Sequence, residues 1–192
     1  MIYGSMGEAL AGARQEKWDQ RFIELARHVG SWSKDPSTKL GAVIVARDLS
    51  VVSVGYNGFP RGVHDTDERL NDRETKYKIV VHAERNAILF ARRDLAGCTL
   101  YTWPFMSCGA CAGMAIQAGI TRCVAPYSDN PRWVADFDLS RQMFEEAQVR
   151  LDLLAATSNE FDLMASNLTA VQARCTELLE ENRALHKRIE NP

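Results

Sequence analysis

The sequence lacks the long apolar runs and the charge excess that define several protein classes. No segment approaches the roughly 20 uninterrupted apolar residues that a membrane-spanning helix needs, so we expect no membrane association. The 23 basic and 25 acidic residues leave a net charge of -2, and the absence of a basic excess argues against binding to nucleic acid. Residues 1–20 lack the charged-then-apolar order of a secretory signal, which predicts a cytoplasmic protein, or one in the host cytoplasm if the source is viral.

Cysteine is scarce and odd in number, which does not favour a disulfide framework. Without an export signal, cysteines are better interpreted as metal ligands or as buried thiols. The five cysteines are Cys98, Cys108, Cys111, Cys123 and Cys175.

The order of the predicted elements indicates the fold class. Residues 1–14 show no clear pattern and are expected to form a flexible leader, whereas residues 15–155 carry the domain. A helix with apolar residues at helical spacing precedes a hairpin of two β-branched runs (40–46 and 51–57) and a polar loop of about twenty residues. Helices and strands then alternate, which predicts an α/β sandwich with a mixed sheet covered by helices on both faces.

The C-terminal segment, residues 157–190, has a different pattern. Thr157 and Glu160 fit a helix-capping box, and apolar residues then alternate three and four positions apart. This pattern predicts a self-associating coiled coil, and the alternative is a helix packed back on the domain. One seam position holds Phe161, Leu168, Cys175, Asn182 and Ile189.

Two short motifs carry the chemistry. His82-Ala83-Glu84 and Cys108-Gly109-Ala110-Cys111 each stand at the start of a predicted helix. One imidazole and two thiolates form a three-ligand set that leaves the fourth position of a Zn²⁺ ion open, as catalytic zinc sites do. Helix N-termini also favour thiolate over thiol.

Glu84 distinguishes a catalytic interpretation from a structural one. A carboxylate two residues from His82 can face the open position and move protons without binding the metal. A redox Cys-x-x-Cys pair would not need the His-Ala-Glu motif, and a structural zinc site would need a fourth ligand. The remaining candidates for that ligand are Cys98, Cys123, His28, His64 and Cys175.

Several further motifs resemble those of the deoxycytidylate (dCMP) deaminase family, within the cytidine deaminase-like superfamily. They are WSKDPSTKLGAVIV, GYNGFPRG, HAERNAI, GCTLYT, CGAC and IQAGI, in order between about Trp18 and Leu154. The resemblance implies a three-layer α/β/α sandwich with a mixed five-stranded sheet. It also implies hydrolysis of dCMP to dUMP and ammonia, by zinc-bound hydroxide with a glutamate proton shuttle, which supplies thymidylate synthesis.

The resemblance also implies roles for individual residues. The zinc ligands map to His82, Cys108 and Cys111, and the proton shuttle maps to Glu84. Substrate contacts are expected from Asn57, which matches a nucleoside-binding asparagine, from Lys34 near the substrate phosphate, and from Ala83.

Regulation and assembly are also expected from the resemblance. Many family members are hexamers activated by dCTP and inhibited by dTTP, which implies a homo-oligomer here. Gly58 and Arg61, in GYNGFPRG, would lie near the regulatory nucleotide, which could carry Mg²⁺.

Three alternatives to a dCMP deaminase stay open. The chain could act on dCTP, or on both nucleotides, or it could be a tRNA adenosine deaminase, although that class is expected to carry a basic RNA-binding face. It could also be a non-catalytic regulator, although an intact Glu84 argues against this. Ser107 departs from the family pattern, in which a proline usually precedes the first cysteine, but no metal ligand is lost.

Overall fold

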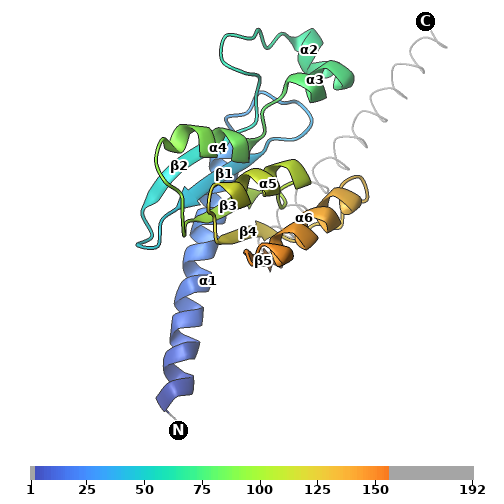
Figure 1. Ribbon diagram of the computed structural model, residues 1–192. Coiled ribbons are helices and arrows are strands. Elements are labelled where there is room, and N and C mark those ends of the chain that lie inside the picture. Colours follow the sequence, from blue (N-terminus) through green and yellow to red (C-terminus); the bar gives the residue numbers. More distant parts are fainter. Residues whose placement is uncertain (1–2, 156–192) are drawn as a thin grey trace, which may run out of the picture. The chain divides into compact units, whose positions relative to one another are not determined.

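A mixed five-stranded sheet with helices on both faces forms the core of the domain (Figure 1). The computed structural model describes residues 3–155, with side chains from residue 12 onward. A unit boundary falls between Leu154 and Ala155, and the expected coiled coil over residues 157–190 lies outside the described residues. The described elements are α1 (Tyr3–Gly30), β1 (Gly41–Val45), β2 (Val51–Tyr56), α2 (Asp67–Asn71), α3 (Arg73–Ile79), α4 (Ala83–Ala91), β3 (Thr99–Trp103), α5 (Gly109–Gln117), β4 (Arg122–Pro126), α6 (Val134–Glu146) and β5 (Arg150–Leu154).

The strands run in the order β2-β1-β3-β4-β5. β1 pairs antiparallel with both β2 and β3, whereas β3, β4 and β5 are parallel to one another. The expected hairpin and the expected mixed five-stranded sheet are therefore confirmed.

Alternation along the strands divides the core into two layers. In β1, Ala42 and Ile44 face a cluster that includes residues of α4, α5 and α6, whereas Val43 and Val45 face a cluster that includes Phe22 and other residues of α1. This period-two pattern is what a sheet covered on both faces requires. Figure 1 shows α1 on one face of the sheet and α4 and α5 on the other, as in an α/β/α sandwich.

The strand directions bring the site together at one edge of the sheet. Because β3 and β4 are parallel, the segments that follow them leave the sheet at the same edge. β1 begins at this edge and β2 ends there, since Gly41 pairs with both Tyr56 and Trp103. Residues 35–40, residue 57, residues 104–108 and residues 127–133 are therefore neighbours, although they are far apart in the sequence.

The structure corrects two expectations. α1 begins at Tyr3, so residues 3–14 of the expected leader are helical; the segment has no proline to stop a helix, although it holds three glycines and shows no apolar periodicity. The long polar loop contains the short helices α2 and α3, whose N-caps are Thr66 and Asp72. No helix of the described residues is long and apolar enough to cross a membrane.

A buried ionic network ties α1 to the sheet. Arg122 of β4 forms ion pairs with Asp19 of α1 and Asp152 of β5, both at 2.6 Å. The Tyr101 hydroxyl donates to Asp19 at 2.7 Å. Burial raises the pKa of Asp19, but the bonds from Arg122, Tyr101 and Gln15 outweigh it and leave that pKa below its usual value. Asp19 is thus held as an anion inside the fold.

α4 lies unusually close to the sheet at Gly55 in β2. A Cβ atom at Gly55 would collide with the carbonyl oxygen of Ala83 and the amide nitrogen of Ala87. Both colliding groups belong to the helix backbone, so no side-chain adjustment can make room. Glycine at this position therefore fixes the distance between β2 and the first turn of α4.

We expect Gly55→Ala to destabilise the domain by at least about 1–3 kcal/mol, because the added methyl group forces the backbones of β2 and α4 apart. The free energy of unfolding in urea measures this change. Gly58→Ala is the matched control, since a Cβ at Gly58 would meet no atom within 4 Å. Equal effects of the two substitutions would contradict the close-approach argument.

Candidate metal centre and active site

Two helix starts meet at the candidate metal centre. His82 is the N-cap of α4 and Cys108 is the N-cap of α5, and neither side chain makes a capping hydrogen bond. The Nδ1 atom of His82 lies 3.4 Å from the Sγ atom of Cys108 and 3.4 Å from that of Cys111. All three ligand atoms lie within 4.8 Å of one another.

These distances fit zinc. In a tetrahedral site with Zn–S near 2.3 Å and Zn–N near 2.0–2.1 Å, a sulfur and a nitrogen ligand are separated by about 3.5 Å. An imidazole with two thiolates is also a donor set that zinc prefers, and three protein ligands leave one position for water or substrate. The zinc-ligand set expected from the sequence is therefore assembled in the fold.

The two thiols are electrostatically coupled. The pKa of Cys108 is lowered to about 4, mainly because the Cys111 thiol donates to its sulfur, with a smaller effect of His82. The pKa of Cys111 is raised by that same hydrogen bond and by burial. Cys108 therefore loses its proton readily, whereas Cys111 keeps its proton. A divalent cation that binds both sulfurs as thiolates displaces this second proton.

Glu84 is a buried carboxyl group beside this cluster. Its side chain is 5% exposed, and its Oε2 atom has no hydrogen-bond partner among the described residues. Burial raises the pKa of Glu84, although the nearby His82 opposes the shift. An unpartnered buried carboxylate oxygen costs free energy, so its place in the wall of a cavity points to a ligand or water as its partner.

A cavity of about 410 Å³ opens beside the cluster. Its size falls within the range of about 300–1,000 Å³ that is typical of small-molecule sites. His82, Glu84 and Cys108 line it, together with an aromatic wall. In this wall the ring of Phe105 lies 6.2 Å from that of Trp133 and 5.4 Å from that of Phe137.

Asn57 lines the same cavity and is fixed on all sides. Its amide group donates to the Thr38 carbonyl at 3.0 Å and to Asp35 Oδ2 at 3.3 Å. The Leu40 amide donates to Asn57 Oδ1 at 2.7 Å. Both amide hydrogens of Asn57 are therefore used, and only its oxygen has a free lone pair for a ligand.

Lys76 of α3 supports this arrangement from behind. It is 3% exposed, and its Nζ atom donates to Asp35 Oδ1 at 2.9 Å and to Ser37 Oγ at 3.0 Å. A buried lysine is tolerated because Asp35 neutralises it. Lys76 thereby holds Asp35, which in turn orients Asn57.

The structure does not bring every expected substrate contact into this cavity. Lys34 forms an exposed ion pair with Asp65 at 2.7 Å and lines a second cavity of about 200 Å³. Ala83 is 1% exposed and packs where α4 meets Gly55, outside the cavity wall.

The two residues expected near a regulatory nucleotide differ in position. Gly58 lines the second cavity, whereas Arg61 lines neither. Asp35, Asn57, Lys76 and Val80 line both cavities and so form a shared wall.

Sequence reasoning missed several residues of the large cavity. Lys76 and Tyr77 lie on α3, in the segment that was expected to be a loop, and Arg73 begins that helix. The available signal was Asp72, whose side chain caps α3 by accepting from the Glu74 amide, in a sequence typical of a helix start. Arg132 gave no comparable signal.

We expect the purified chain to hold one zinc ion and Cys108→Ala to hold less than a tenth of that amount, because two protein ligands bind zinc far more weakly than three. Metal analysis of the purified proteins measures the ratio. Cys98→Ala is the control, since Cys98 is also a free cysteine but lies outside the cluster. A Cys108→Ala protein with full zinc content would contradict the assignment.

The comparisons with known proteins agree with this geometry. Residues 16–126 match the family model described as "Cytidine and deoxycytidylate deaminase zinc-binding region". An uncharacterized deaminase of Aliivibrio fischeri is 45% identical over 141 residues, which cover 72% of this chain and 94% of that protein.

Human deoxycytidylate deaminase is 39% identical over 116 residues, which cover 56% of this chain but only 64% of the human protein. The crystal structure of a dCMP deaminase from the cyanophage S-TIM5 has the same fold, with a TM-score of 0.56 at 21% identity over 71% of this chain and 96% of that one. The zinc-binding motifs, the fold and the family model agree, and the chain belongs to the cytidine and deoxycytidylate deaminase family.

Proposed function

We propose that the chain hydrolyses the 4-amino group of a deoxycytidine nucleotide, converting dCMP to dUMP and ammonia and so supplying thymidylate synthesis. The observation that carries this proposal is the unpartnered buried carboxylate of Glu84, in one cavity with His82 and Cys108. The names of the related deoxycytidylate deaminases support the choice of substrate.

His82, Cys108 and Cys111 would hold the metal in this reaction. A zinc ion at this site supplies Lewis-acid activation of water at neutral pH. Glu84 would accept one proton from the water that adds to C4 of the base and pass it to the ring nitrogen. It would then accept the second proton from the new C4 hydroxyl group and pass it to the amino group, which leaves as ammonia when the C4–N bond breaks and the C4 carbonyl forms. Its burial suits this task, because a raised pKa brings a carboxylate closer to the working pH and makes it a better proton carrier.

The other residues of the cavity orient the nucleotide. Phe105, Trp133 and Phe137 provide an apolar aromatic wall for the base. Asn57 has only an acceptor to offer, so it is suited to a hydroxyl group of the sugar. The fixed amide thus selects a donor at this position of the substrate.

Regulation and location complete the proposal. The second cavity, lined by Lys34 and Gly58, would take the dCTP or dTTP effector, with Mg²⁺ accompanying its phosphates. Arg61 stays a candidate contact from the neighbouring loop. A cytoplasmic location follows from the proposed use of free nucleotides.

The alternative substrates differ in charge and size. A tRNA substrate is disfavoured by the net charge of -2, since RNA-binding surfaces are strongly basic. A non-catalytic role would leave the buried Glu84 carboxylate without a purpose. dCTP differs from dCMP only in its phosphates and stays the second candidate.

We expect Glu84→Gln to keep its zinc and to lose turnover by about 10²–10⁴-fold, because the amide cannot carry the proton. Ammonia release from dCMP, dCTP, cytidine and adenosine-containing RNA measures activity and substrate choice together. Glu74→Gln, at an exposed glutamate of α3, is the control. A Glu84→Gln enzyme with normal turnover, or a wild type that is inactive on every nucleotide, would refute the proposal.

We propose further that the chain is a homo-oligomer whose heptad segment pairs subunits, within or between the hexamers expected from the family. Deleting residues 157–192 should lower the number of subunits in the assembly, obtained by dividing the mass from light scattering by the mass of the shortened chain, because the proposed helix–helix contacts are lost. An Asn182→Ile variant, which removes the polar seam residue, should instead keep or raise the mass. An unchanged number of subunits after deletion would show that the main subunit contacts lie elsewhere.

A further inference from the structure

The large cavity has a buried end and an open rim. Glu84 and Asn57 are 5% and 2% exposed, whereas Tyr77 is 46% exposed, and Arg73 and Arg132 are also exposed. All five line the same cavity. A ligand that places its reacting group beside Glu84 therefore extends toward the two arginines.

The two arginines share one aromatic ring. The guanidinium of Arg73 lies 5.4 Å from the centre of the Tyr77 ring and that of Arg132 lies 5.3 Å from it. Arg132 also lies over the ring of Trp133, at 4.8 Å. These cation–π contacts hold both guanidinium groups beside the Tyr77 ring and leave their N–H donors available.

No ion pair of the described residues includes Arg73 or Arg132. The other nearby cations are neutralised, Lys76 by Asp35 at 2.9 Å and Lys34 by Asp65 at 2.7 Å. Arg73 and Arg132 repel each other at the Tyr77 ring, and an anion bound between them would offset this repulsion. Guanidinium groups match the geometry of phosphate oxygens, so a phosphate is the anion that best completes this arrangement.

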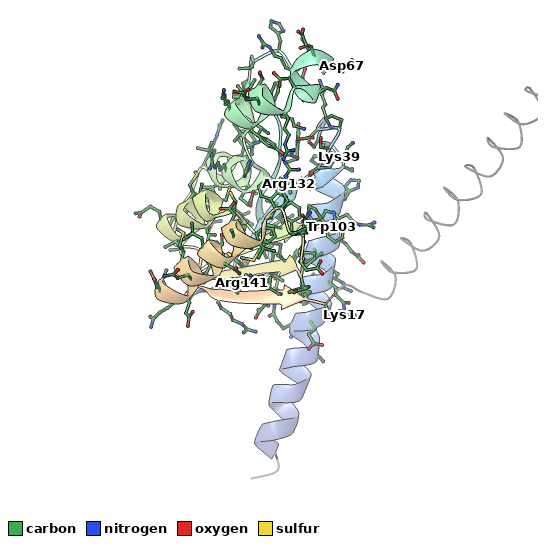
Figure 2. All side chains as sticks on the ribbon, turned by 90° about the vertical axis from the view of Figure 1, so that its right-hand side faces the viewer. Lys17, Lys39, Asp67, Trp103, Arg132 and Arg141 are labelled. Carbon is green, nitrogen blue, oxygen red and sulfur yellow. The ribbon has the colours of Figure 1, made fainter. Side chains whose placement is uncertain are left out.

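The two arginines come from separate segments. Arg73 and Tyr77 belong to α3, in the long segment between β2 and α4, and Arg132 lies in the loop between β4 and α6. In Figure 2, Arg132 is labelled between the α2–α3 segment, at the top of the view, and α6, lower in the view. The long segment therefore supplies one half of a cationic rim and the β4–α6 loop supplies the other.

Resting on the proposed function, we infer that Arg73 and Arg132, held by Tyr77 and Trp133, bind the 5′-phosphate of the nucleotide substrate. With the base amine at Glu84, the 5′ substituent points away from the metal centre and toward the rim. This inference replaces Lys34 as the phosphate contact, because Lys34 lines the other cavity.

The test compares dCMP with deoxycytidine, which lacks the phosphate. Arg73→Gln and Arg132→Gln should each lower the ratio of kcat/KM for dCMP to that for deoxycytidine by about tenfold, mainly through KM, because each removes a charge-assisted hydrogen bond. The double variant should lower the ratio further and weaken its dependence on salt.

Arg141→Gln is the matched control. This arginine lies on α6 (Figure 2), outside the cavity wall. It pairs with Asp138 at 2.6 Å. Its substitution should leave the ratio within about twofold of wild type, because exposed pairs on one helix contribute little. If the ratio falls as much in Arg141→Gln as in the two cavity variants, the effect comes from the change in net charge, and the inference is overturned.

The remaining outcomes separate the inference from the function on which it rests. If the double variant keeps the wild-type ratio, or loses both substrates equally, the arginines do not bind the phosphate and the deaminase proposal stands. If the wild type deaminates no nucleotide, the proposed function fails and the inference fails with it. If the double variant loses more kcat/KM with dCTP than with dCMP, the result would support the arginines as ligands of a triphosphate.

Discussion

The contact between the backbones of α4 and β2 at Gly55 is the constraint on which the metal centre depends. Because the first turn of α4 lies directly against a strand, its position is set by the sheet and not by adjustable side chains. His82 and Glu84 stand on either side of Ala83, whose small side chain permits this packing. The sheet thereby fixes both the imidazole ligand and the carboxyl group, while α5 brings the two thiols to them. A displacement of α4 would move both groups of the first motif together.

The use of N-cap positions for two metal ligands has an energetic consequence. Ordinarily an N-cap side chain accepts a hydrogen bond from the first turn, but neither His82 nor Cys108 does so. The unpaired amides at a helix start give it a partial positive charge, which favours the thiolate form of Cys108 and offsets part of the missing cap. A metal held by His82, Cys108 and Cys111 would require the second thiol as thiolate and would link the two helix starts, so the local structure and the metal are expected to stabilise each other.

The site residues that lie close together in the sequence could be predicted from local patterns. The contacts between residues that meet only across the fold could not. The His-Ala-Glu and Cys-x-x-Cys spacings belong to single helix turns, and the β-branched runs with the order of helices and strands predicted the sheet. Lys76 and Asp35 are 41 positions apart, so no local pattern joins them. Lys34 was the obvious cation beside the substrate, but its partner Asp65 turns it toward the second cavity. Helix α3 is short and mainly polar, and so it has no apolar periodicity by which to recognise it.

The shared wall of the two cavities explains why a buried ion pair is placed there. Asp35 accepts from Lys76 with one oxygen and from Asn57 with the other, so each group limits the movement of the next. An apolar wall of equal volume could be as stable, but it could not fix the direction of an amide group. The segment between β2 and α4 contributes two residues to the large cavity. Lys76 is buried and holds Asp35 beside Asn57, whereas Arg73 lies at the exposed rim. The position of α3 is therefore linked to the orientation of the group that the proposal assigns to the sugar, and α3 belongs to the site as much as the two motif helices do.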